Sequence, residues 1–274
     1  CHDTAAWPPR DITKKARSGF SDLIRFGDVS EIQLDHGIAL SVDVSDQSQI
    51  PQTPYWRMLV LDDYTNGTFR LSSTMRGQFL AERTGAFQAG HARPRLGSKA
   101  VCTFYLESGV SRYLPMLGPF DMLRFREVQN YRYAPNPVLM ALREEPVSMT
   151  AYRVEGFDLS ANLPDPVFAE RWRQRAEKEQ KPLALQIRLL LQDSDVDVVR
   201  RTAAEIAGGT TRSTGEFARL ASDWLRLRHN YSLTPNLPRG DGDPLVRWLV
   251  SREAGHCELF AGSLVLLARA AGIP

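Results

Sequence analysis

Apolar residues fall on every second position early in the chain, which is the period of a β-strand with one buried face. In residues 38–44, the apolar side chains alternate with small or polar ones, and they are Ile38, Leu40, Val42 and Val44. This alternation predicts a strand that lies on a core with one face and meets solvent with the other.

A hairpin is predicted inside YWRMLVLDDYTNGTFRLS, residues 55–72. Asn66 and Gly67 separate two strand-like segments, and both residue types accept the positive φ of a type I′ turn. AVCTFYLES (residues 100–108) and PVSMTAYRVEG (146–156) are further strand candidates, and no convincing helix interrupts this half. Residues 1–157 are therefore predicted to form an all-β domain, either a sandwich or barrel-like.

The pattern changes after residue 157. The polar, proline-bearing segment FDLSANLPDPV predicts a linker, and FAERWRQRAEKEQK predicts a charged surface helix, so residues 158–192 are assigned to a linker and surface helix. The arginines and lysines of this helix are interpreted as a solvated face and not as a binding patch.

Residues 193–274 have the helical period. DVDVVRRTAAEIAGG places apolar residues on one stripe and ends at Gly208-Gly209. Ser213 and Glu216 form a capping-box pattern at the start of the next helix, and Asp243-Pro244 is a typical N-cap followed by proline. The fold class is thus α+β, with strands first and helices afterwards.

Composition narrows the functional classes. The 274 residues are 43% hydrophobic and carry a net charge of +2, which suits one or two globular domains and gives no field that would attract nucleic acid. No segment is long and apolar enough to span a bilayer. The chain begins at Cys1, which indicates an excised or processed polypeptide; the sequence leaves open whether Cys1 is lipidated.

The last predicted helix begins near Cys257 and ends at Gly272. Gly255 is expected to let the backbone turn sharply before it, which places the cysteine in the first helical turn. Backbone N–H groups there favour an anion, and cysteines at helix N-termini ionise more readily than ordinary ones. The same position also suits a small buried hydrophobe, so the residues alone leave a nucleophile and a core cysteine as alternatives.

GHCELFAGSLVLLARAAGIP, residues 255–274, resembles the nucleophile segment of the transglutaminase-like superfamily of papain-like cysteine enzymes. The shared pattern is Gly-x-Cys at a helix start, Phe-Ala next, and Arg-x-x-Gly-Ile-Pro at the helix end. This resemblance implies that Cys257 is the catalytic nucleophile. It also implies that residues 193–274 are the helical first part of a papain-like core, truncated after this helix, with the family's His and Asp on strands that follow.

The first half resembles, more loosely, the β region of bacterial membrane-anchored transglutaminase-like proteins. GFSDLIRFGDVSEIQLDHGIALSVDV and PYWRMLVLDDYTNGTF carry that resemblance. It implies an extracytoplasmic location at the periplasmic face of the inner membrane, with the anchor in segments outside this sequence.

The family chemistry implied is cysteine-dependent acyl transfer on protein carboxamides through a Cys-His-Asp triad, as in glutamine crosslinking or deamidation. The alternatives are a cysteine protease or amidase on the same fold, and a non-catalytic binding scaffold of the cell envelope. The substrate expected is a protein or peptide. The sequence does not choose between crosslinking, deamidation and proteolysis, nor does it identify the substrate, the oligomeric state or the role of the β domain.

No cofactor or metal site is expected, because no three or four ligands can be assembled around the five histidines. His256 is the neighbour of Cys257 and is poorly placed as its base, because adjacent helical residues point about 100° apart. The last helix is apolar on nearly every face. We therefore expect Leu259, Leu266 and their neighbours to form an exposed patch that favours self-association.

Overall fold

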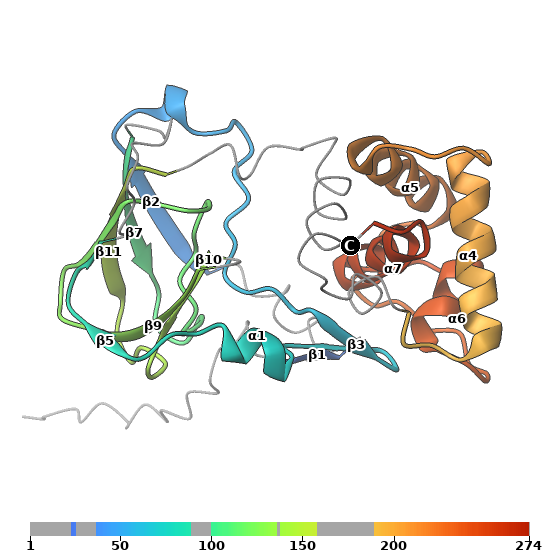
Figure 1. Ribbon diagram of the computed structural model, residues 1–274, viewed down its shortest axis with the longest axis horizontal. Coiled ribbons are helices and arrows are strands. Elements are labelled where there is room, and N and C mark those ends of the chain that lie inside the picture. The colour runs from blue at the N-terminus through green and yellow to red at the C-terminus, as the bar shows by residue number, and fades with distance from the viewer. Residues whose placement is uncertain (1–22, 26–36, 89–99, 136–137, 158–188, 274) are drawn as a thin grey trace, which may run out of the picture.

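The computed structural model describes residues 23–25, 37–88, 100–135, 138–157 and 189–273 (Figure 1). Strands make up the first part of these residues and helices the last part, which confirms the α+β class. Most of the linker and surface helix assigned to residues 158–192 lies outside the described residues, so the boundaries around it stay a prediction.

Two antiparallel sheets form the N-terminal unit. The larger has the order β2-β7-β11-β8-β6, with bounds β2 Leu40–Val44, β6 Phe87–Gln88, β7 Val101–Leu106, β8 Met122–Phe125 and β11 Thr150–Glu155. The smaller has the order β10-β9-β5, with bounds β5 Arg83–Thr84, β9 Asn130–Pro135 and β10 Val138–Leu142. The strands predicted at residues 38–44, 100–108 and 146–156 are β2, β7 and β11.

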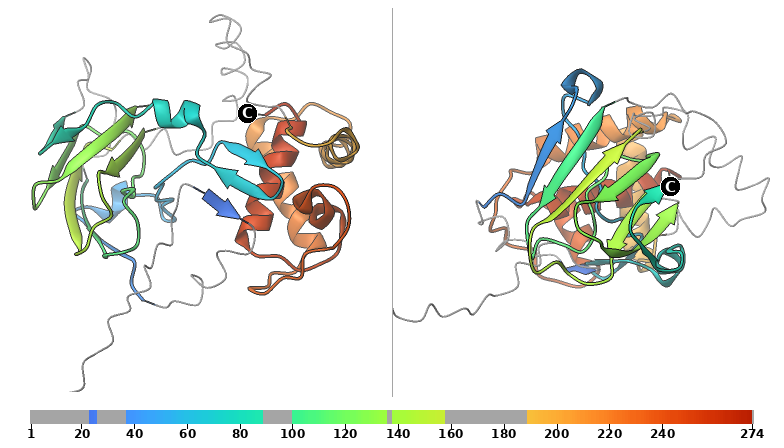
Figure 2. Two further views of the ribbon diagram at one scale, coloured as in Figure 1. Left: turned by 90° about the horizontal axis from the view of Figure 1, so that it is seen from below. Right: turned by 90° about the vertical axis from the view of Figure 1, so that its left-hand side faces the viewer.

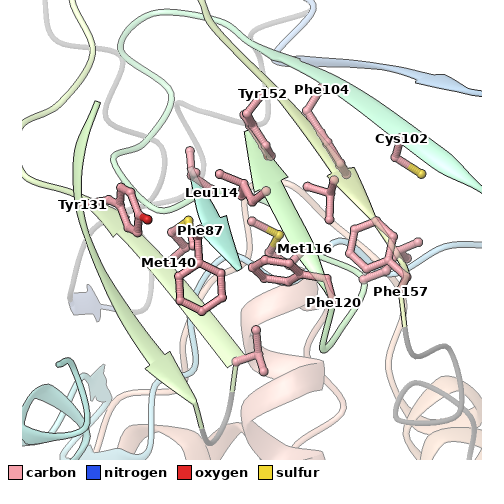
Figure 3. Close-up of a cluster of buried hydrophobic side chains, with 14 of the residues drawn as sticks. Phe87, Cys102, Phe104, Leu114, Met116, Phe120, Tyr131, Met140, Tyr152 and Phe157 are labelled. Atoms are coloured by element: carbon pink, nitrogen blue, oxygen red, sulfur yellow. The ribbon is translucent and has the colours of Figure 1, made fainter. Parts of the chain in front are cut away.

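Both sheets enclose one aromatic core, as a sandwich does (Figure 3). Alternate residues of β7 are buried, which is the period expected for its one-sided burial. Phe104 of β7 pairs in register with Tyr152 of β11, and their rings stack with centroids 4.7 Å apart. The Tyr152 hydroxyl donates to the backbone oxygen of Pro115 at 2.9 Å, so this buried polar atom is satisfied.

Short helical turns do occur in this half, contrary to the expectation of strands alone. The 3-10 helix η2 spans Gln47–Gln49, and α1 spans Ser73–Gly77. Ser72 caps α1 by accepting from the backbone N–H of Met75 at 3.0 Å. Each turn is too short to produce a hydrophobic period, which is why the pattern of residues did not reveal them.

The predicted hairpin is present, but it packs against the helices. β3 (Asp63–Thr65) and β4 (Thr68–Arg70) are joined by Asn66 at φ 43° and Gly67 at φ 76°, as a type I′ turn requires. They form a separate sheet, β1-β4-β3, with β1 (Leu23–Arg25). Tyr64 is buried in the helical core, so this hairpin of the predicted N-terminal domain packs against the helices, and the domain boundary at residue 157 stays a prediction.

Within residues 189–273 the structure describes four helices, which form the C-terminal unit: α4 (Asp193–Ala207), α5 (Thr214–Arg228), α6 (Pro244–Val250) and α7 (Cys257–Ala270). The predicted ends are confirmed. Gly208 ends α4 in the left-handed conformation, and Asp243 caps α6. The Ser213 hydroxyl caps α5, while the Glu216 carboxylate bonds Arg212 at 2.7 Å instead of closing the capping box.

Helix α7 is central to this unit, because it contacts α4, α5 and α6. The hairpin β3–β4 lies along the same group of helices (Figure 2). Trp248 of α6 is the largest fully buried side chain of the whole described structure. The helical unit therefore completes its core with two strands that come from far earlier in the sequence.

Candidate functional site around Cys257

Cys257 is the first residue of α7, and it is exposed. Cys102, in contrast, lies on β7 with no solvent exposure, and burial raises the pKa of its thiol to about 11. Cys1 lies outside the described residues. Among the cysteines that the structure describes, Cys257 alone is accessible to a reagent or substrate and lies at a helix N-terminus, the position that favours an anion.

Gly255 is required by close packing and not by an unusual backbone angle. It is absent from the residues with positive φ. A Cβ atom built on Gly255 would lie 2.8 Å from Cε2 of Trp248 and closer still to its Cζ2. The glycine thus lets the chain pass directly over the indole ring, which corrects the expectation that Gly255 serves a sharp turn.

The chain before Cys257 is fixed from its other side by residues 230–232. The Gly255 N–H donates to the Asn230 oxygen at 2.9 Å, and the Ser232 N–H donates to the Gly255 oxygen at 2.8 Å. The Trp248 indole N–H donates to the Ala254 oxygen at 3.1 Å. Because that N–H is occupied, Trp248 supports the backbone and is not available as a side-chain donor to an oxyanion.

His229 stacks on Trp248, with ring centroids 4.0 Å apart. Its Nδ1 lies 2.9 Å from the Glu253 backbone oxygen, and since a carbonyl only accepts, Nδ1 carries the proton. Burial lowers the pKa of His229. The neutral form is therefore favoured, and His229 ties α5 to the loop that leads to Cys257.

His256 is the N-cap residue of α7 and is only 1% exposed. Its Nε2 lies 3.6 Å from Oε2 of Glu258, and its Nδ1 has no hydrogen-bond partner among the described residues. Burial lowers the pKa of His256. The two residues that flank Cys257 are thus packed inward while the thiol itself is exposed, which supports a structural role for His256.

The exposed face of α7 differs from the expected one. Leu259 and Leu266 are buried, at 0% and 1% exposure, because the neighbouring helices and the hairpin cover them. Phe260 is half-buried and lies against Tyr231, which is 60% exposed, with ring centroids 6.4 Å apart. The expectation of a patch centred on Leu259 and Leu266 is therefore wrong, and self-association stays a prediction.

The described residues also contain a cavity, but no candidate metal site and no membrane-spanning helix. A cavity of about 350 Å³ is found near the opposite end of α7, lined by Arg200, Arg212, Ala270, Ala271 and others. No group of three or more His, Cys, Asp or Glu in the described ranges could hold a metal ion. None of the helices within those ranges is long and apolar enough to cross a membrane.

Acidification is expected to destabilise the protein through His229 and His256. Both pKa values are lowered from 6.5 by burial, so below about pH 6.5 the unfolded chain takes up protons that the folded chain does not. This stabilisation is complete above that pH and is lost as the pH falls toward the folded-state pKa values. Each histidine then lowers the free energy of unfolding by about 1.4 kcal/mol per pH unit.

Urea unfolding at several pH values between about 7.5 and 5 measures this slope. The double variant His229→Asn, His256→Asn is the control, and its slope is expected to be clearly shallower in that interval. An equal slope in the parent protein and the double variant would show that these histidines do not titrate with folding.

Two family models match the chain. Residues 3–159 match the TgpA N-terminal domain, and residues 200–274 match the transglutaminase-like superfamily. No curated protein matches the chain.

Two crystal structures of the periplasmic domain of TgpA from Pseudomonas aeruginosa share the fold. They have TM-scores of 0.62 and, for the form bound to ethylmercury, 0.61, each at 18% identity over 94% of this chain. The matches cover 78% and 80% of those chains, respectively. The model of the TgpA N-terminal domain spans more than half of the sequence, and residues 200–274, the helical part, match the transglutaminase-like superfamily. This chain therefore belongs to the TgpA N-terminal domain family.

Proposed function

We propose that this protein is a cysteine-dependent acyltransferase acting on the carboxamides of proteins or peptides, with Cys257 as its nucleophile. The observation that carries this proposal is the exposed thiol at the first residue of α7, on a backbone held by Trp248 and residues 230–232. A nucleophile needs access and a fixed position, and Cys257 has both. The match of residues 200–274 to the transglutaminase-like superfamily supports the same reaction class.

In the proposed reaction, Sγ of Cys257 attacks the carbonyl carbon of a glutamine side-chain amide. The C–S bond forms, the C–N bond breaks, and the thiol proton passes through a general base to the leaving ammonia. The resulting thioester is then attacked by an amine, which gives a crosslink, or by water, which gives a carboxylic acid. Backbone N–H groups at a helix N-terminus suit the negative oxygen of the tetrahedral intermediate.

The general base is expected outside the described residues. His229 and His256 are buried, and the Nδ1 proton of His229 is donated to the Glu253 oxygen. Neither arrangement suits proton transfer at an exposed sulfur. The superfamily's His and Asp remain the proposed partners of Cys257.

We place the protein in the bacterial cell envelope, on the periplasmic side, with a membrane anchor outside the described residues. The support is its likeness to a domain that is periplasmic in TgpA. Protein or peptide substrates in that compartment would reach Cys257 from the solvent-exposed start of α7. The proposed reaction needs no metal or other cofactor.

The first test is thiol reactivity in a Cys1→Ser background. Iodoacetamide near neutral pH should modify Cys257 at least about tenfold faster than the buried Cys102. A matched control introduces a thiol by Ala261→Cys in a Cys257→Ala protein, because residue 261 is also exposed and lies one turn further along α7. Cys257 should react about fivefold faster than this control thiol.

The second test is turnover by the natural full-length polypeptide. Incorporation of a fluorescent amine into a glutamine-rich protein, release of ammonia, and cleavage of peptides distinguish crosslinking, deamidation and proteolysis. Cys257→Ala should remove whichever activity is found. If the natural polypeptide shows none of the three and Cys257 reacts no faster than the control thiol, the non-catalytic scaffold is the better reading.

Ethylmercury provides a third probe. One crystal structure of the TgpA periplasmic domain contains bound ethylmercury. Mercury is a soft metal, and thiolates are the protein ligands that suit soft metals. In the Cys1→Ser protein, one equivalent is expected to bind at Cys257 and to block alkylation there, while Cys102 remains protected by burial.

A further inference from the structure

The hairpin β3–β4 is joined to the helical unit by a buried hydrogen-bond network. Tyr64 is 1% exposed, and its hydroxyl donates to Oδ1 of Asp243 at 2.6 Å while accepting from the Gly67 N–H at 3.0 Å. Burial first, and the Asp243 carboxylate second, raise the pKa of Tyr64, so the hydroxyl keeps its proton. The turn of the hairpin is thereby connected to the N-terminus of α6.

The connection continues from α6 to α4. The same Oδ1 of Asp243 accepts from the backbone N–H groups of Leu245 and Val246, and the Asp243 N–H donates to Asp195 at 2.8 Å. Asp195 lies in the first turn of α4. The Asp243 carboxylate thus joins the hairpin to the start of α6, and the Asp243 backbone N–H joins α6 to the Asp195 carboxylate at the start of α4.

A second contact joins the hairpin directly to α7. The Arg269 guanidinium, in the last turn of α7, donates to the backbone oxygen of Asp62 at 3.0 Å. The Asp62 carboxylate in turn accepts from the N–H and the hydroxyl of Ser72, at 2.9 and 2.6 Å. Asp62 and Ser72 flank the two strands, so Arg269 reaches the point where the hairpin closes.

The hydrogen bonds of Tyr64 and Arg269 connect the hairpin to α6 and α7, the two helices that determine where Cys257 lies. Helix α6 carries Trp248, over which the chain passes at Gly255, and α7 begins with Cys257 itself. The Tyr64 ring also belongs to the same buried cluster as Trp248 and Leu259. A shift of the hairpin would therefore act on α6 and on α7, the two helices that fix the backbone at Cys257.

We propose that the β3–β4 hairpin is a positioning element for Cys257, with Tyr64 and Arg269 as its positioning residues. The idea rests on the proposed role of Cys257 as nucleophile. In this proposal the N-terminal region helps to build the reactive site, because the helical unit needs the β3–β4 hairpin to hold Cys257 in place. The strands before the linker are then more than an independent binding module.

The test compares matched pairs of variants. Tyr64→Phe removes one buried hydroxyl from the hairpin contact, and Tyr152→Phe removes an equally buried hydroxyl from the β core. Arg269→Gln removes an arginine bond to a backbone oxygen, and Arg132→Gln removes bonds of that kind within the N-terminal half. All variants carry Cys1→Ser, and near-ultraviolet circular dichroism confirms that each is folded.

Two readouts are taken on each folded variant. Tyr64→Phe and Arg269→Gln should speed amide hydrogen exchange in α7 and slow alkylation of Cys257 by about two- to fivefold. Tyr152→Phe and Arg132→Gln should leave both unchanged.

Unaltered Cys257 alkylation in both hairpin variants would overturn the positioning role. Failure of the proposed function is separate, because it appears in the parent protein as a Cys257 no more reactive than the thiol introduced by Ala261→Cys. If one hairpin variant does not fold, the other carries the comparison.

Discussion

Gly255→Ala should lower the free energy of unfolding by about 3 kcal/mol, because the added methyl group has no room. Its carbon would lie 2.8 Å from Cε2 of Trp248 and nearer to Cζ2, and both belong to a rigid ring that is fully buried. Either Trp248 or the backbone at residues 254–256 must move. Chemical denaturation measures the loss.

The same substitution should also slow alkylation of Cys257, since the backbone displaced is the one that leads into α7. Gly215→Ala is the matched control. Gly215 lies within α5, and nothing stands within 4 Å of a Cβ built there. That control should be neutral or stabilising by up to about 1 kcal/mol, because alanine favours helix more than glycine does. Equal stability of Gly255→Ala and the parent protein would mean that Trp248 has another position available.

Local sequence signals predicted the elements well. Asn66-Gly67 marked a type I′ turn, Gly208 marked the end of α4, and Asp243-Pro244 marked the start of α6; all three are confirmed. Each signal depends on the backbone preference of one or two residues, and that preference is a property of the residue type itself. Such preferences hold whatever the element later packs against.

The partners of those elements were not predictable in the same way. Asn66-Gly67 predicted the turn of the hairpin, but a turn signal does not say what the hairpin packs against. In the structure Tyr64 meets Asp243, which is 179 residues away in the sequence. A tyrosine beside a turn and an aspartate before a proline each have a local explanation, so nothing in either pattern signals their contact.

The candidate site shows the same division. The position of Cys257 at the start of α7 followed from the helical period and the resemblance of its segment. Its exposure, which argues against a core cysteine, required the structure, because the apolar residues around it suggested burial. The role of Gly255 was mistaken for the same reason, since only the three-dimensional contact with Trp248 distinguishes close packing from a turn.

Asp243→Ala is expected to destabilise the protein by about 3 kcal/mol, more than an ordinary loss of a helix cap. The substitution removes the acceptor of the Leu245 and Val246 N–H groups and also leaves the buried Tyr64 hydroxyl without its carboxylate. An unsatisfied buried donor keeps its full desolvation cost, which is the reason for the added penalty. Ser213→Ala, which removes the exposed cap of α5, is the comparison and should cost about 1 kcal/mol.

A double-mutant cycle isolates the hydrogen bond between hairpin and helix. If the Tyr64 hydroxyl depends on Asp243, then Tyr64→Phe should cost much less in an Asp243→Ala background than in the parent, with a coupling energy of at least about 1 kcal/mol. Tyr152→Phe combined with Asp243→Ala should be additive, because the Tyr152 hydroxyl bonds Pro115 in the other core. Additivity in the Tyr64 cycle would contradict the buried bond, and the excess cost of Asp243→Ala would then have to come from the helix cap alone.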